Sequence, residues 1–259
     1  MIAAADLVIL EINQNLPWTY GETEVHISEV SYVVENHIPL VQLPAEAPSE
    51  TEQLIGGHIA GLIEDGATLQ LGIGGIPNAI TSFLHERKDL GLHTEMFVDG
   101  MVDLYEAGIV NNRKKTLRRG KMVATFGLGT QKLYDFLDRN VSVEILSGRY
   151  VNDPYVIAQN HKMISVNTAI QVDVLGQVCS QSLGTRQFSG TGGQLDTHRG
   201  AQMSEGGRGI IALRSTAKNG TISTIVPTLA PGSGVTVPSQ DVDTLVTEYG
   251  VAELRGRCV

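Results

Sequence analysis

Two glycine-rich stretches have the residue types and spacing best suited to chemistry on a bound molecule. The first, LGIGGIPNAI, places Gly72, Gly74 and Gly75 between an expected strand and an expected helix. Backbone N–H groups at such a helix start can bind an anion or an oxyanion, although a tight strand-to-helix turn would need the same glycines. No Lys-Ser/Thr pair follows and the spacing fits the dinucleotide fingerprint poorly, so neither an ATP site nor an NAD site is indicated.

The second stretch runs from Val166 to Gln194 and is almost free of charge. It ends in SGTGGQ, residues 189–194, where the density of glycine indicates that backbone approaches another group closely. A generic turn is the alternative. The centre of the stretch looks built to hold a reactive group, yet it carries an amide, Gln171.

Other reaction chemistries have no support in the residue spacing. The seven histidines form no HExxH or similar metal-ligand pattern, and no GxSxG elbow is present. The two cysteines, Cys179 and Cys258, exclude a disulfide framework and a cysteine-based zinc site, and they favour a reducing compartment. We therefore predict no metal site.

Composition restricts the class of partner. The formal net charge of -9 argues against a general nucleic-acid binder, and the single basic run, RKKTLRRG, is best interpreted as a solvated loop. No window approaches the roughly 18 apolar residues of a membrane span. The content of hydrophobic residues, 42%, is typical of a globular domain.

From about residue 50 onward, strand patterns alternate with single helix patterns, which predicts an α/β domain with a mainly parallel sheet. Ser49 or Thr51 is expected to cap a first helix that Gly66 stops. The glycine loops should gather at one end of the strands. Near the end of the chain, VTEYGVAELRG reads as a strand followed by a helix start.

The first 45 residues have a different pattern. Leu7–Ile12 reads as a buried strand without a leader before it, and the proline-rich segment PLVQLPAEAPSETE, residues 39–52, has the composition of a linker. We expect residues 1–45 to be the end of a first domain with its linker, and residues 46–259 to be a second domain. Both ends of the chain look cut, because the first strand reads as the middle of a fold and the other end has no cap or tail after its last strand and helix start.

Several long motifs in order carry a family resemblance. They are LQLGIGGIPNAI, HTEMFVDGMVDLYEAGIV, NDPYVIAQN, GQVCSQSLGTRQFSGTGGQ, IIALRSTAKNGTISTIVPTLAPG and VTEYGVAELRG. Together they resemble the acetyl-CoA hydrolase/transferase family, especially its 4-hydroxybutyrate CoA-transferase branch. The resemblance extends over essentially the whole chain and implies a CoA-transferase-like (NagB/RpiA-like) α/β fold, incomplete at the C-terminus.

The resemblance implies a reaction and a place for its nucleophile. In this family a glutamate attacks an acyl-CoA, and a glutamyl-CoA thioester then carries CoA to a second carboxylic acid. The family's motif N-[ST]-x-[IVL]-E-x-D aligns with NTAIQVD, so that Gln171 matches the glutamate. Asp173 belongs to the same motif and is expected to be structural, and Gln181 is another amide.

The resemblance also implies binding residues. The segment GRYVN, which comprises Gly148, Arg149, Tyr150, Val151 and Asn152, matches a CoA-contacting loop, although a surface ion pair would explain Arg149 equally well. Gly250 corresponds to a backbone donor aimed at the thioester oxygen. Gly192 and Gly193 are expected to line the same cleft.

The resemblance thus predicts CoA transfer from a short-chain acyl-CoA to a carboxylic acid such as acetate. Because an amide is a poor nucleophile, a catalytically impaired CoA-thioester-binding protein and an acyl-CoA hydrolase are the alternatives. Coenzyme A thioester is expected as a substrate, with no permanently bound cofactor. The expected partners are the acyl-CoA and the carboxylate, without nucleic acid or membrane but with a possible homo-oligomer, in the cytoplasm or the mitochondrial matrix.

Overall fold

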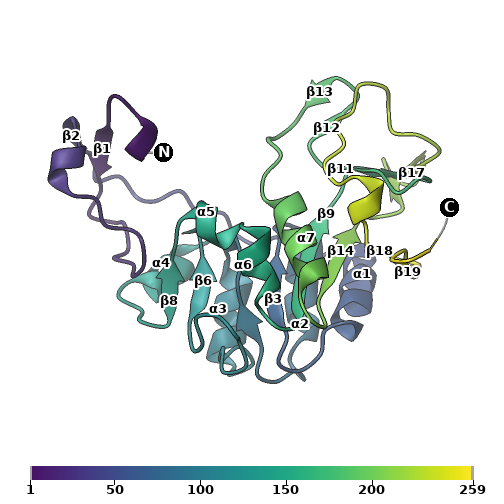
Figure 1. Ribbon diagram of the computed structural model, residues 1–259, viewed down its shortest axis with the longest axis horizontal. Helices are drawn as coiled ribbons and strands as arrows, with labels where there is room; N and C mark the ends of the chain where they lie inside the picture. Colours follow the sequence, from purple (N-terminus) through teal and green to yellow (C-terminus); the bar gives the residue numbers. More distant parts are fainter. Residues whose placement is uncertain (1, 258–259) are drawn as a thin grey trace.

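The computed structural model describes residues 2–257 and has two visibly different parts (Figure 1). Most of the chain forms an α/β domain in which helices cover a twisted sheet. The first residues, drawn in purple, form a small strand pair that lies beside this domain. Among the described residues, no helix is both long and apolar enough to cross a membrane.

A six-stranded sheet is the centre of the α/β domain. Its strand order is β19-β18-β14-β9-β3-β4, and every neighbouring pair is parallel except β18 and β19. The predicted α/β class with a mainly parallel sheet is confirmed. The strands are β3 (Thr68–Leu71), β4 (Gly91–Leu92), β9 (Met163–Thr168), β14 (Arg208–Ala212), β18 (Thr244–Thr247) and β19 (Gly250–Glu253).

Shorter parallel pairs extend this sheet beyond β4. A bridge between His93 and Val123 joins the two regions, and the strand at Val143–Ile145 forms the far side. These pairs consist of β5 (Met96–Phe97) with β7 (Phe126–Gly127), and β6 (Met122–Ala124) with β8 (Val143–Ile145).

Helices cover both faces of the sheet. The helices are α1 (Glu50–Gly61), α2 (Gly75–Phe83), α3 (Asp99–Glu106), α4 (Gln131–Leu137), α5 (Gly148–Val151), α6 (Pro154–Ala158) and α7 (Gln194–Met203). Alternate residues of β9 divide between the faces: Ile164 and Val166 join the main core with α1 and α2, whereas Met163 packs with residues of α6 and α7. The positions between these core residues are buried but polar, with Thr68 and Gln70 on β3 and Ser165 on β9, so these strands alternate apolar and polar residues.

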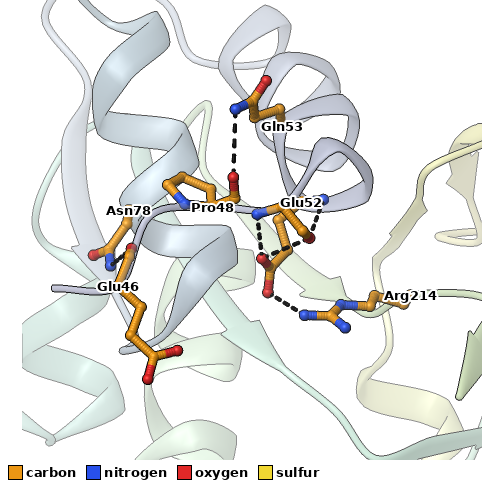
Figure 2. Close-up of polar contacts among 7 residues, drawn as sticks. Glu46, Pro48, Glu52, Gln53, Asn78 and Arg214 are labelled. Atoms are coloured by element: carbon orange, nitrogen blue, oxygen red, sulfur yellow. Dashed lines mark hydrogen bonds and ion pairs between the residues drawn. The ribbon is translucent and has the colours of Figure 1, made fainter. Parts of the chain in front are cut away.

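Helix α1 begins as the sequence predicts. Ser49 is the N-cap, its hydroxyl accepts from the Glu52 N–H, and the Glu52 carboxylate accepts from the Ser49 N–H, which is a complete capping box. Arg214, which follows β14, donates to the same carboxylate at 2.6 Å (Figure 2). Burial alone would raise the pKa of Glu52, but hydrogen bonds from Arg214 and Ser49 outweigh it and hold that pKa below its usual value.

Three local expectations were wrong. Helix α1 ends at Gly61 rather than at Gly66, because the C-cap residue Leu62 already turns the chain. The expected helix start after Gly250 is strand β19, which pairs with β18. The expected loop at residues 148–152 is the short helix α5, whose first turn Ser147 caps by accepting from the Arg149 N–H.

The remaining strands lie outside the main sheet. The strand expected at Leu7–Ile12 is β1 (Ile9–Ile12), and it pairs in parallel with β2 (Tyr32–Glu35). Apolar side chains on both strands are exposed, including Ile9 and Tyr32. Small sheets follow β9: β10 (Gln171–Asp173) with β11 (Val178–Cys179) and β17 (Ile225–Val226), β12 (Ser182–Leu183) with β13 (Arg186–Gln187), and β15 (Thr216–Ala217) with β16 (Ile222–Ser223).

Candidate active site

A cavity of about 560 Å³ opens at the carboxyl ends of the parallel strands. The end of β3, the start of β5, the end of β9 and the glycine-rich loop before α7 all contribute to its wall. Glu95 is the one ionisable side chain among its lining residues. The polar lining residues are Gln70, Glu95, Asn167, Ser180, Gln181, Ser189, Thr191 and Gln194.

The backbone at Glu95 is held firmly in the sheet. The carbonyl of Glu95 accepts hydrogen bonds from the N–H groups of Thr125 (2.9 Å) and Phe126 (3.2 Å). One residue earlier, the Thr94 N–H donates to the Val123 carbonyl at 3.0 Å. Glu95 is half-buried, and within residues 2–257 its carboxylate forms no hydrogen bond and no ion pair. The side chain therefore starts from a rigid position with its oxygens uncommitted.

The glycine-rich loop packs directly on this carboxylate. A β-carbon at Gly193 would lie 2.5 Å from Glu95 Oε2 and 2.5 Å from Asn152 Nδ2, so only a glycine allows this approach. Gly192 has φ of +57°, in the left-handed region that glycine adopts without strain. Gly193 is also the N-cap of α7, so the free N–H groups of that helix start beside Glu95.

A buried polar network fixes the floor of the cavity. The Asn167 amide donates to Gln70 Oε1 (3.2 Å) and to Thr197 Oγ1 (3.2 Å), and the Ser165 hydroxyl donates to the same Gln70 oxygen at 2.6 Å. Gln70 Nε2 donates in return to Asn167 Oδ1 at 3.3 Å. Because the two amides restrain each other, their orientation is set before any ligand enters.

Two further polar atoms of the lining are available to a ligand. Gln194 Nε2 and Ser180 Oγ are both buried and have no hydrogen-bond partner within the described part of the chain. A buried donor without a partner is costly, and a bound carbonyl oxygen or developing oxyanion would satisfy it. The cavity thus combines one carboxylate with neutral hydrogen-bond donors, the arrangement required for carboxylate attack on a polarised carbonyl carbon.

Acidic neighbours add to the electrostatics at the mouth of the site. Burial raises the pKa of Asp196, in the first turn of α7, and the charges of Glu95 and Asp153 raise it further against the opposing effect of Arg199. In the described residues, no group of three or more His, Cys, Asp or Glu is placed to hold a metal ion.

The structure places only some of the sequence-predicted residues at this cavity. Gly192 and Gly193 line it, together with Gln181, and the Asn152 side chain contacts Gly193. Gln171 lies outside the lining: it is on β10 opposite the buried Cys179, and its Oε1 atom is buried without a partner in residues 2–257. Gly250 lies opposite Thr247 in the β18–β19 hairpin and is also outside the lining.

The other members of the predicted CoA-contacting segment lie elsewhere. Gly148, Arg149 and Tyr150 line a separate open cavity of about 760 Å³ together with Glu22. Val151 is buried, and its carbonyl accepts from the His93 ring at 2.8 Å. Asp173 accepts hydrogen bonds from the Leu175 and Gln177 N–H groups, which agrees with the structural role expected for it.

Glu95 was missed by reasoning from the sequence. The stretch LGLHTEMFVDG carries it between an apolar strand and a helix start, and it is the first acidic side chain after that strand. In a parallel sheet such a position lies at the ligand-binding edge. That signal was present but was assigned only to a strand and a turn.

Comparison with known proteins gives a consistent result. The model of the acetyl-CoA hydrolase/transferase C-terminal domain matches residues 129–259. The chain is 52% identical over 254 residues to a 4-hydroxybutyrate coenzyme A transferase of Clostridium kluyveri, a match that covers 98% of this chain and 59% of the relative. It is 51% identical to a succinyl-CoA:cyclohexane-1-carboxylate CoA transferase of Geobacter metallireducens, with coverage of 99% and 59%.

Solved structures agree with this match. The crystal structure of RipA from Yersinia pestis superposes with a TM-score of 0.92 at 42% identity, over 99% of this chain and 58% of that one. A 4-hydroxybutyrate CoA-transferase from Porphyromonas gingivalis gives a TM-score of 0.85 at 41% identity, over 99% and 61%. The chain therefore spans about six-tenths of the length of the relatives that it matches.

Proposed function

The chain belongs to the acetyl-CoA hydrolase/transferase family, and on that premise we propose that it is the part of a CoA-transferase that carries the nucleophile, and that this nucleophile is Glu95. The proposed reaction moves CoA from a short-chain acyl-CoA to a carboxylic acid such as acetate. The supporting observation is the cavity itself, whose one ionisable lining residue is a carboxylate packed against a glycine-rich helix start.

The chemistry follows from a carboxylate in this setting. The Glu95 carboxylate attacks the thioester carbonyl carbon, and the CoA thiolate leaves to give a mixed anhydride. The thiolate then attacks the glutamyl carbonyl, which releases the first carboxylic acid and leaves CoA bound to Glu95 as a thioester. A second carboxylate reverses these steps and departs as the new acyl-CoA. The exchange conserves activated acyl bonds, so it needs no ATP and no resident cofactor.

The neutral donors stabilise the charge that develops on each carbonyl oxygen. Gln194 Nε2 and the N–H groups at the start of α7 are available for this purpose, because the former has no partner in the described residues and the latter begin at the cap residue Gly193. The amides of Gln70 and Asn167 already donate to each other, so they fix the wall of the cavity around these donors. Donors held in place in this way need no reorganisation when the oxyanion forms.

Under this proposal, Gln171 is not evidence that the protein is catalytically impaired. Its position on β10 leaves it outside the cavity lining, so the absence of a carboxylate there does not remove the nucleophile. The alternatives of a binding-only protein and of a hydrolase depended on that absence. Relatives named CoA transferases match this chain at 52% and 51% identity.

The test is to trap the covalent intermediate. The protein is incubated with acetyl-CoA, digested and analysed by mass spectrometry, with borohydride reduction of a parallel sample to convert a glutamyl thioester into the alcohol. We expect a CoA-mass adduct on the peptide that contains Glu95. The Glu95→Gln variant should give no adduct and should lose at least ~10³-fold in kcat, because the nucleophile is gone.

Gln171→Glu is the matched control. It adds a carboxylate at the place indicated by the sequence motif, and we expect its adduct to remain on Glu95 with little change in rate. An adduct on residue 171 in this variant, together with an unmodified Glu95 in the wild-type protein, would show that the nucleophile has been assigned to the wrong position.

A further inference from the structure

A second cavity of about 380 Å³ lies next to the Glu95 cavity. Ile73 lines both, so this residue is a common part of their walls. The wall of the second cavity is largely apolar, with Leu43, Pro44, Val98 and Leu128 among its residues. The proposed function does not use this space.

Three chain segments lead from the first cavity into the second. After β3, Gly72 and Ile73 line the Glu95 cavity, and Gly74 and Gly75 continue into the second. In the same way, the segment that begins with Glu95 and Met96 continues to Val98 and Asp99, and the segment with Phe126 continues to Leu128. The two cavities therefore adjoin along three segments of the chain.

The roof of the second cavity is held in place from both ends. It is the linker segment 43–46, in which the Leu43 N–H donates to the Gly129 carbonyl at 2.9 Å. At the other end, the Asn78 amide donates to the Glu46 carbonyl at 3.3 Å (Figure 2). Just before the roof, the Tyr134 hydroxyl donates to the Val41 carbonyl at 2.6 Å. The cavity is consequently preformed, which lowers the entropic cost of filling it.

The charges around this cavity select against anions. Glu46 and Asp99 are its ionisable lining residues, and both are acidic. The Asp99 carboxylate is already occupied, because it accepts from the Thr130 N–H (2.9 Å) and from the Thr130 hydroxyl (2.8 Å). An apolar wall with only acidic neighbours favours an uncharged hydrocarbon group over a second carboxylate.

Building on the proposed function, we infer that the second cavity binds the aliphatic tail of the acyl group. It accepts uncharged acyl chains of a few carbons beyond the thioester carbonyl and disfavours dicarboxylic acyl groups. The linker that forms its roof is thus a specificity element for the acyl chain.

Ala45 is the position at which to test this inference, because its small side chain lines the cavity and its substitution disturbs no buried packing. Ala45→Phe adds a large side chain to the roof, whereas Ala47→Phe makes the same change two residues further on, outside the lining. Dissociation constants for acetyl-CoA, butyryl-CoA and succinyl-CoA are measured by calorimetry for Glu95→Gln, alone and combined with each of these two substitutions. Glu95→Gln removes the proposed nucleophile, so the heat reports binding without a covalent step at Glu95.

We expect the Glu95→Gln protein to bind butyryl-CoA more tightly than acetyl-CoA and about tenfold more tightly than succinyl-CoA. Ala45→Phe should weaken butyryl-CoA about tenfold and leave acetyl-CoA unchanged, while Ala47→Phe should leave both unchanged. An equal effect of Ala45→Phe on acetyl-CoA and butyryl-CoA, or binding of succinyl-CoA by Glu95→Gln as tight as that of butyryl-CoA, would overturn the inference. Failure of the proposed function is distinguished by the adduct experiment, in which Glu95 would stay unmodified.

Discussion

Gly193 has no room for a side chain at the point where the site is most crowded. An added β-carbon would meet Glu95 Oε2 and Asn152 Nδ2, each at 2.5 Å, so Gly193→Ala must displace the carboxylate that we propose as the nucleophile. A shift of about 1 Å from the productive geometry costs on the order of 10²-fold in rate. We expect Gly193→Ala to lower kcat by about that factor with a smaller effect on KM.

The control for this substitution is Gly190→Ala, in the same loop. Its β-carbon would meet nothing within 4 Å, and its φ lies outside the left-handed region. Steady-state kinetics of the two variants should therefore differ strongly. Equal activity of Gly193→Ala and the wild-type protein would mean that Glu95 does not need its present position.

Residue types alone could not distinguish Glu95 from Gln171. Both lie near the end of an apolar segment, and both are followed closely by an acidic residue. Only the folded structure distinguishes them, because it brings the Gly193 backbone into contact with Glu95, although 98 positions separate them in the sequence. The glycine-rich loop was predicted to approach some group closely, and the structure supplies the identity of that group.

Helix α1 contains two adjacent glycines, one packed closely against α2 and one with free space beside it. Substituting each with alanine distinguishes the effect of packing on stability from the effect of helix propensity. Gly56 faces α2, where a β-carbon would lie 2.7 Å from the Ala79 β-carbon and 3.0 Å from the Ala79 carbonyl carbon. Gly57 has room, since its nearest neighbour would be the Phe83 ring at 3.9 Å. We expect Gly56→Ala to lower the free energy of unfolding by ~1–3 kcal/mol, because the two helices must separate.

Gly57→Ala should have the opposite effect. Alanine loses less backbone entropy on folding than glycine, so a gain of ~0.5–1 kcal/mol is expected where no clash occurs. Urea denaturation of both variants measures the two changes. Stabilisation by Gly56→Ala would contradict the close helix contact.

At the level of elements, local signals predicted the starts better than the ends. The capping box of Ser49 and Glu52 is complete within four residues, so the start of α1 was readable. Strand β19 could not be predicted in this way. Gly250–Glu253 is a β-strand because it forms hydrogen bonds with β18, and such pairing is set by tertiary structure. Likewise, HTEMFVDG contains only the two-residue strand β5, since Glu95 before it lines the cavity and Asp99 after it begins α3.

At the level of the whole molecule, the sheet direction explains most of what was predicted correctly. Alternating strands and helices required parallel pairing, and parallel pairing puts the loops after β3 and β9 at one edge. The cavity that contains Glu95 opens at this same edge. Its lining was not predictable, since it depends on side chains such as Gln70 and Asn167 that meet only through the β3–β9 register.

Two buried histidines give the whole molecule a predictable response to acid. Burial lowers the pKa of His93 and the pKa of His198 to about 4. In the unfolded chain the pKa of each histidine is about 6.5. Between about pH 4 and about pH 6.5, therefore, the unfolded state binds protons that the folded state does not. Their contribution to stability is complete above about pH 6.5 and is lost as the pH falls toward 4, on the order of 3 kcal/mol for each group.

His198 allows this loss to be assigned, because its ring nitrogens have no partner within residues 2–257 and its ring fills the space left by Gly209. His198→Gln removes the titrating group, whereas His161→Gln removes one that is exposed and serves as the control. The free energy of unfolding is measured by urea denaturation at pH 7.5 and at pH 5. We expect the decrease between these pH values to be smaller in His198→Gln than in the wild-type protein and unchanged in His161→Gln, even though His198→Gln is less stable overall. If all three proteins lose the same free energy, the folded protein binds a proton at His198 as readily as the unfolded chain does, and burial is not the cause of the acid sensitivity.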